Sequence, residues 1–231
     1  MNIKGIHKTS LIDFPGSISA IIFSGGCNLR CRYCHNPDLA CNSCGLQGYS
    51  NDEALSFIMS RIHLIDAVVL SGGEPTLSPR IKDFTKTIKN LGLKVKLDTN
   101  GFNPDIVNDL VLEGLLDYIA MDIKTSPEKY HLLTGNDSPF DTIIDTLDIL
   151  RHSGVLYELR TTCIPEYVTM DDLFAIRDKV EHVDAYFLQQ FVNTTTLDEA
   201  FHTIQPYPPE TLISFRQFVS TFADTCEVRG I

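Results

Sequence analysis

The chain has 231 residues, 43% of them hydrophobic and 21% charged, and a formal net charge of −11. This length allows one sizeable core, so we expect a single domain over residues 1–231. The acidic balance and the lack of a basic run argue against a general nucleic-acid binder. No apolar stretch is long enough for a membrane helix and the first residues do not form a secretory signal. We therefore expect a cytoplasmic protein with reduced thiols and no membrane association.

Apolar runs of strand length alternate along the chain with segments of helical character. Six such runs cover residues 18–23, 67–70, 93–97, 118–120, 155–159 and 185–188. The helical segments, which show apolar periodicity, capping residues or an early proline, cover residues 51–62, 79–91, 104–112, 141–152, 171–180 and 208–223. A short strand is expected at residues 226–228. Strand–helix repetition at this spacing predicts parallel strands joined by right-handed crossovers.

The number of strand–helix units limits the fold. Six units are fewer than the eight of a complete barrel, and a complete barrel usually needs a longer chain. We therefore predict an α/β fold, an open partial (β/α)6 barrel of parallel strands. Each of the six apolar runs is followed by glycine, carboxylate, amide or cationic residues. The C-terminal ends of barrel strands form the active-site face, so these residues predict a site there.

The loop after the first predicted strand contains three cysteines in the spacing C-x-x-x-C-x-x-C: Cys27, Cys31 and Cys34. Three thiolates leave one iron of a four-iron cluster without a protein ligand, and that open position suits a substrate or cofactor. The spacing therefore predicts a metal or cluster site. A zinc site completed by His35, or by Cys41 and Cys44, is the alternative.

The other cysteines are less informative. Cys41 and Cys44 are too few for a second four-iron cluster by themselves. They form a redox-active or structural pair, half of a further site, or two spare thiols in a loop. Cys163, in the region of the fifth predicted strand, and Cys226, near the end of the sequence, are expected to be small buried residues.

The cysteine loop, with Tyr33 before its third cysteine, resembles the signature of the radical S-adenosylmethionine (SAM) superfamily, and Gly-Gly-Glu-Pro after the second predicted strand is similar to the methionine-binding motif of that superfamily. Over nearly the whole chain, the sequence more closely resembles the small activating enzymes of glycyl-radical proteins. The residues responsible are KTSLIDFPG (8–16), GGCNLRCRYCHNPDL (25–39), SGGEPTL (71–77), KLDTNG (96–101), AMDIK (120–124), ELRTT (158–162), LQQF (188–191) and EVRG (227–230).

The resemblance implies an enzyme and its cofactors. Cys27, Cys31 and Cys34 would be the catalytic cysteines of this enzyme. They would hold a 4Fe–4S cluster whose open iron binds SAM. Reduction would cleave SAM to methionine and a 5′-deoxyadenosyl radical, which removes hydrogen from a glycine of a partner protein. The implied partner is a glycyl-radical enzyme, most closely anaerobic ribonucleoside-triphosphate reductase, with a flavodoxin- or ferredoxin-type protein as reductant.

Other functions stay open at this point. The partner could instead be a pyruvate formate-lyase-like or another glycyl-radical enzyme. A radical SAM enzyme that acts on a small molecule is a further alternative, and the short chain argues against it because little sequence is left to cover the barrel. The non-enzyme alternatives are an iron–sulfur electron carrier and a zinc protein.

The resemblance also implies cofactor-binding residues at the strand ends. Gly72 and Gly73 would let the backbone approach the methionine moiety, and Glu74 would accept from its ammonium group. The ring of Tyr33 would lie against the adenine. Gln190, after the sixth predicted strand, is placed in the same set.

Charged residues complete the implied site. Lys124 and Arg160 suit the methionine carboxylate, and Asp98 and Asp122 suit ribose hydroxyls or a cation. Some resembling enzymes hold a monovalent cation, and Asp98, Thr99 and Asp122 match those positions.

Asp13 precedes Phe-Pro-Gly, which is an ordinary turn sequence. The resemblance gives Asp13 the further role of holding the partner peptide.

Overall fold

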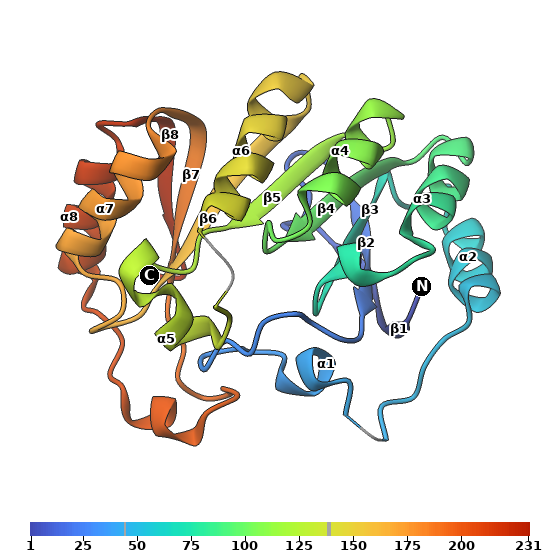
Figure 1. Cartoon of the computed structure of the whole chain (residues 1–231). Helices are drawn as coiled ribbons and strands as arrows, with labels where there is room; N and C mark the ends of the chain where they lie inside the picture. The colour runs from blue at the N-terminus through green and yellow to red at the C-terminus, as the bar shows by residue number, and fades with distance from the viewer. Residues whose placement is uncertain (44, 138–139) are drawn as a thin grey trace.

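The computed structural model describes residues 1–43, 45–137 and 140–231, and within them one sheet of eight strands follows the order of the chain (Figure 1). Its strands are β1 (Ile3–Ser10), β2 (Ser19–Ser24), β3 (Ala67–Gly72), β4 (Lys94–Thr99), β5 (Tyr118–Asp122), β6 (Leu156–Cys163), β7 (Val183–Gln190) and β8 (Ala223–Arg229). β1 pairs antiparallel with β2, and every later pair of neighbours is parallel. Since β1 and β8 do not pair, the barrel is open, as predicted.

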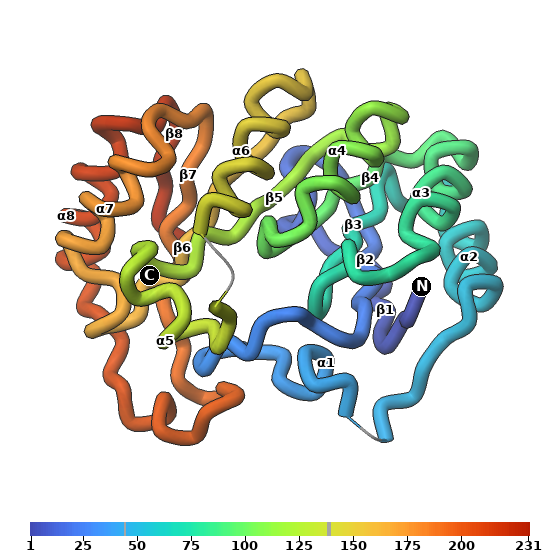
Figure 2. Tube along the Cα trace, viewed as in Figure 1, coloured from blue at the N-terminus to red at the C-terminus, as the bar shows by residue number. Residues whose placement is uncertain are grey.

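The longer helices follow one another along the outside of the curved sheet (Figures 1 and 2). They are α2 (Asn51–Ser60), α3 (Ile81–Asn90), α4 (Pro104–Leu112), α6 (Asp141–Ser153), α7 (Met170–Val180) and α8 (Pro209–Val219). Two short helices, α1 (Pro37–Cys41) and α5 (Tyr130–Thr134), lie near the cysteine loop (Figure 1). Within the described residues, no helix has the length and apolarity to cross a membrane.

The sheet is buried on both faces, as is usual for parallel strands. On β3, Val68 and Leu70 are fully buried in the main core under the helices. The alternate residues, Ala67 and Val69, belong to a second, smaller core on the other face, together with Tyr118 and other apolar side chains. The smaller core closes the inside of the partial barrel below the strand ends.

The structure differs from the predicted elements mainly at the ends of the chain. The six predicted strands correspond to β2–β7, but β1 was not predicted. β1 is an edge strand with exposed His7 and Lys8, so its sequence lacks an apolar run. As a result, the cysteine loop follows the first parallel strand but the second strand of the chain.

Three predicted helix boundaries were wrong by two residues or more. α2 ends at Ser60, two residues earlier than predicted. α3 begins at Ile81, two residues later than predicted, because residues 79 and 80 form a turn. α8 ends at Val219, and Phe222 and Ala223, which we placed in the helix, are buried beyond it, with Ala223 already in β8. Apolar residues at helical spacing continued past the helix because both elements bury them in the same core.

One buried carboxylate holds the start of α7 against the connection that follows β5. Thr169 and Asp172 form a capping box at the N-terminus of α7. Asp172 also accepts hydrogen bonds from Ser126 Oγ and Lys129 Nζ, each at 2.7 Å. Burial of the Asp172 carboxyl raises its pKa, but the hydrogen bonds from Lys129, Thr169 and Ser126 lower it more, so the net pKa lies below its ordinary value.

We predict that Asp172→Asn lowers the free energy of unfolding by about 1–3 kcal/mol, because the amide loses the charge and one acceptor oxygen. The exposed neighbour Asp171 provides the control, and Asp171→Asn should cost less than about 0.5 kcal/mol. Urea denaturation at pH 7 measures both variants.

The acid dependence has a definite sign. Because the folded pKa of Asp172 is depressed, its stabilisation is present above the unfolded value of about 3.9 and is lost as the pH falls through the folded pKa. The stability difference between the wild type and Asp172→Asn should therefore shrink below about pH 4. A difference that stays constant down to pH 2.5 would contradict this assignment.

Candidate active site

A cavity of about 370 Å³ lies at the C-terminal ends of the parallel strands. Its lining comes from the loop between β1 and β2, the cysteine loop, and the ends of β3 to β7. The predicted site residues in this lining are Asp13, Cys27, Cys31, Tyr33, Cys34, Gly72, Gly73, Asp98, Thr99, Asp122, Lys124 and Arg160. Residues more than 140 positions apart in the sequence therefore meet at one cavity, at the strand ends where the site was expected.

The three cysteine thiols line one side of this cavity. Cys31 is buried, and Cys27 and Cys34 are partly exposed. The Cys27 sulfur accepts a hydrogen bond from the backbone N–H of Leu29 at 3.4 Å and lies 3.8 Å from Asn100 Nδ2. Among the described residues, no three His, Cys, Asp or Glu side chains converge closely enough to bind a single metal ion. The three thiols come from one short loop and line the same cavity, and three thiolates would leave one iron of a four-iron cluster without a protein ligand.

Burial keeps these thiols protonated when they carry no metal. Burial raises the pKa of Cys31 to about 12, although the positive charge of Lys124 partly offsets the rise. Burial also raises the pKa values of Cys27 and Cys34. Since thiolates are the metal-binding form, cluster assembly must release protons from this loop.

Tyr33 lies between the last two cysteines of the loop, and its ring is buried against the cavity. Lys124 Nζ lies 5.9 Å from the centroid of this ring. His35 also lines the cavity, and its Nδ1 is 3.0 Å from the Thr195 carbonyl oxygen. The imidazole is thus oriented by the segment after β7 through Nδ1, which leaves Nε2 free.

Gly72 and Gly73 are required by the close approach of two strand ends. A Cβ atom on Gly73 would lie 2.1 Å from the Gly26 carbonyl oxygen, and one on Gly72 would lie 2.5 Å from the backbone of Ser24. Gly72 also has a φ of +113°, which favours glycine. Both glycines therefore let the segment before Cys27 pack directly on the end of β3, while they also line the cavity.

The carboxylate of Glu74 is committed to protein donors. Its Oε1 accepts from Thr76 N, Thr76 Oγ1 and Thr99 Oγ1, and its Oε2 accepts from Asn100 N at 2.7 Å. The side chain is buried and does not line the cavity with the cysteines. In this structure Glu74 joins the segment after β3 to the end of β4, which differs from the contact with an ammonium group that we predicted.

A row of alternating charges runs across the cavity from β4 to the segment after β5. We call Asp98, Arg160, Asp122 and Lys124, which all line the cavity, the charge row. Arg160 Nη1 lies 3.4 Å from Asp98 Oδ1, and Lys96 Nζ, which is outside the row, lies at the same distance from this oxygen. Arg160 Nε lies 2.8 Å from Asp122 Oδ1, and Lys124 Nζ lies 2.8 Å from Asp122 Oδ2. The register places Asp122 directly opposite Arg160 on neighbouring strands.

Asp122 and Lys124 keep their ionised forms over a wide pH range. Removal of the Asp122 carboxyl from water would raise its pKa, but Arg160 and Lys124 lower it more, to about 2. Burial alone would lower the pKa of Lys124, yet Asp122 holds it well above its ordinary value. Two cations against two carboxylates leave the row without net charge, and Lys124 and Arg160 offer donors to an anionic group. The monovalent cation considered near Asp98, Thr99 and Asp122 stays a prediction.

The structure adds residues that the sequence did not identify. On β7 the cavity is lined by Gln189, and the predicted residue Gln190 instead donates from Nε2 to the Tyr207 carbonyl oxygen at 2.7 Å. Gln189 is the register partner of Thr162, another lining residue. Alternate residues of a strand face the same side, so Thr162 faces the cavity as Arg160 does, and the strand pairing places Gln189 beside Thr162. The sequence alone does not give this pairing, so it could not identify Gln189.

Asn100 and Ser71 also line the cavity. Asn100 Nδ2 donates to Asn28 Oδ1 at 2.7 Å, and Ser71 Oγ donates to Asp98 Oδ2 at 2.9 Å. Both residues follow the apolar runs of predicted strands, so the sequence indicated that they lie at the strand ends that form the site. Their roles as supports of the cysteine loop and of Asp98 needed the structure.

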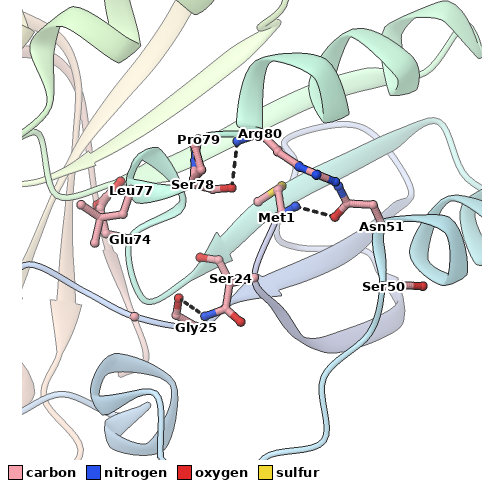
Figure 3. Close-up of a pocket in the computed structure, with 12 residues that line it drawn as sticks. Met1, Ser24, Gly25, Ser50, Asn51, Glu74, Leu77, Ser78, Pro79 and Arg80 are labelled. Atoms are coloured by element: carbon pink, nitrogen blue, oxygen red, sulfur yellow. Dashed lines mark hydrogen bonds between the residues drawn. The ribbon is translucent and has the colours of Figure 1, made fainter.

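A second, larger cavity of about 590 Å³ lies beside the starts of α2 and α3 (Figure 3). Glu74, Met1, Asn51 and Arg80 are among its lining residues, and Met1 N donates to Asn51 Oδ1. The described residues that line it include no cysteine. Size alone would select this cavity, but the thiols and the charge row assign the chemistry to the smaller one.

The remaining cysteines divide as follows. Cys163 and Cys226 are buried, as expected. Cys41 is exposed at the end of α1, and Cys44 lies outside the described residues, so the structure does not test a joint role for the two.

Comparisons with known proteins agree with the geometry. The sequence profile of the Radical SAM superfamily matches residues 21–179. A Methanocaldococcus jannaschii protein named as a glycyl-radical enzyme activating enzyme is 32% identical, over 99% of this chain and 96% of its own length. The pyruvate formate-lyase-activating enzyme of Clostridium pasteurianum is 31% identical, over 71% of this chain and 68% of its own. Streptococcus suis SuiB bound to SAM has a similar fold, with a TM-score of 0.69 and 15% identity, over 91% of this chain and 50% of SuiB.

We predict that replacing Cys27, Cys31 or Cys34 with Ala abolishes binding of a four-iron cluster, because each removes one of three protein ligands. Iron and sulfide analysis after anaerobic reconstitution measures the result. The control is Cys41→Ser, an exposed thiol in the same region, which should retain the wild-type iron content. A Cys31→Ala protein with wild-type iron, or a Cys41→Ser protein that loses it, would contradict the ligand assignment.

Proposed function

We propose that this chain, which belongs to the radical SAM superfamily, installs a glycyl radical on a partner enzyme, and that the partner is anaerobic ribonucleoside-triphosphate reductase. The relative of nearly equal length named as a glycyl-radical enzyme activating enzyme supports the reaction type. The resemblance that the eight motifs from residues 8–16 to 227–230 carry together supports the partner. The observation that carries the proposal is the convergence of three thiols, Tyr33 and the charge row on one cavity at the strand ends.

The residues present fit a 4Fe–4S cluster with one open iron. Cys27, Cys31 and Cys34 would hold it, since their thiols surround the same cavity. A reduced cluster with SAM bound supplies an electron for cleavage of SAM and, through the resulting carbon radical, removal of a hydrogen atom from glycine. Asn100 and the backbone of Leu29, which contact the Cys27 sulfur, would stabilise its thiolate form.

The charge row would bind and orient SAM. Its two cations, Lys124 and Arg160, lie at the strand ends next to the cysteine loop and would attract the methionine carboxylate. Because Asp122 fixes both cations, little side-chain entropy is lost when the carboxylate binds. Tyr33 offers a ring face for the adenine, and Gly72 and Gly73 leave room beside their backbone.

A second candidate partner is pyruvate formate-lyase, because its activating enzymes are similar to this chain over about three quarters of the sequence. The test is to reconstitute the protein anaerobically, reduce it, and mix it with SAM and each purified partner. With anaerobic ribonucleoside-triphosphate reductase, we expect 5′-deoxyadenosine and the EPR doublet of a glycyl radical. A radical on pyruvate formate-lyase alone would assign the second partner. SAM cleavage with neither radical would favour a small-molecule substrate, and no cleavage would favour an electron carrier.

We predict that Lys124→Met weakens SAM binding by about 10- to 100-fold, because it removes a charge-assisted hydrogen bond of about 1.5–3 kcal/mol. The control is Lys86→Met, which removes an exposed lysine on α3. Equilibrium dialysis of the reconstituted proteins gives the dissociation constants, with iron content measured in parallel. Equal affinities in the two variants would show that the carboxylate binds elsewhere.

A further inference from the structure

The segment of residues 11–17, between β1 and β2, brings one residue into the active-site cavity and another into the inside of the barrel. We call it the β1–β2 loop. Asp13 lines the cavity, and Phe14 packs in the smaller core with its ring centroid 5.9 Å from that of Tyr118. Leu11 and Ile12 are 73% and 87% exposed. Few side chains of this loop are therefore anchored by packing.

Polar contacts hold the loop where packing does not. Ser10 Oγ donates to Asp13 Oδ2 and accepts from the backbone N–H groups of Ile12 and Asp13, each at 3.2 Å. Lys96 Nζ donates to the backbone carbonyl oxygen of Asp13 at 2.6 Å. Through Lys96, β4 therefore holds Asp13 at the cavity by its backbone.

Lys96 is an uncommon residue for this location. Its side chain is only 4% exposed, and lysine is rarely buried unless it is paired. Its partners are the Asp13 carbonyl oxygen, the Asp98 carboxylate at 3.4 Å and the Tyr118 ring, whose centroid lies 5.5 Å from Nζ. The same ammonium group thus contacts the loop on one side and the charge row on the other.

Asp98 needs this lysine. Its Oδ1 is buried and accepts no hydrogen bond, and it lies 3.4 Å from both Lys96 Nζ and Arg160 Nη1. Without Lys96, Arg160 would be the one cation left next to the Asp98 carboxylate among the described residues, and Arg160 also forms an ion pair with Asp122. The position of the loop and the charge balance of the cavity therefore depend on one side chain.

We propose that Lys96 is a positioning residue that holds the β1–β2 loop as a wall of the polypeptide-binding site, so that Asp13 faces the incoming glycine segment. This inference rests on the proposed function. Lys96 does not line the cavity, so it acts through the Asp13 backbone and Asp98. Its loss should release the loop and weaken polypeptide binding more than it slows radical formation on the bound polypeptide.

The test compares Lys96→Met with Lys94→Met in reconstituted holoenzyme, with anaerobic ribonucleoside-triphosphate reductase as substrate. Lys94 is the matched control because it comes from the same strand and approaches the same loop, with Nζ 3.4 Å from Ser17 Oγ, but it is exposed and does not contact Asp98. EPR quantification of the glycyl radical against reductase concentration gives KM and kcat. We expect Lys96→Met to raise KM about ten-fold or more with kcat within about three-fold, and Lys94→Met to change neither by more than about two-fold.

A KM for Lys96→Met equal to that of Lys94→Met, or a loss confined to kcat, would overturn the proposal. If Lys96→Met does not fold, Ser10→Ala provides a second test, because it loosens the same loop and leaves both cations of Asp98 in place. Ser10→Ala should raise KM and leave kcat unchanged. An unchanged KM in folded Ser10→Ala would equally overturn the proposal. Failure of the proposed function is distinguishable, because wild-type protein would then form no radical on the reductase.

Discussion

The Asp122 carboxylate, enclosed between Arg160 and Lys124, is the interaction on which the active-site cavity depends. It joins the end of β5 to β6 and holds two cations at 2.8 Å beside the cysteine loop. Partly buried cations without this carboxylate would repel each other and would lose several kcal/mol of compensation. With it, the strand ends present two fixed cations to a cavity that also contains three thiols whose pKa values burial raises.

Much of the fold was predictable because the parallel strands are buried on both faces. Such strands appear in the sequence as short apolar runs, and β2 to β7 were all found in this way. β1 escaped because an edge strand with exposed His7 and Lys8 has no such run. The end of α8 was misplaced because Phe222 continues the helical apolar spacing although it lies beyond the helix.

The candidate site was predictable in its location and less so in its contacts. Polar residues after apolar runs indicated the strand ends, and most of them line one cavity. The sequence could not distinguish a side chain that lines the cavity from one that only holds neighbouring segments of the protein together. Glu74 follows the glycine pair as expected, yet four hydrogen bonds commit it to the protein. The choice between Gln189 and Gln190 depends on strand register, which only the structure supplies.

The central claim is that Cys27, Cys31 and Cys34 hold a cluster whose open iron binds SAM in this cavity. Low-temperature EPR of the reduced, reconstituted protein, recorded before and after addition of SAM, tests it most directly. The account predicts the signal of one reduced 4Fe–4S cluster, with g values that change when SAM coordinates the open iron. A cluster spectrum that SAM leaves unchanged, in protein shown to contain four irons per chain, would contradict it.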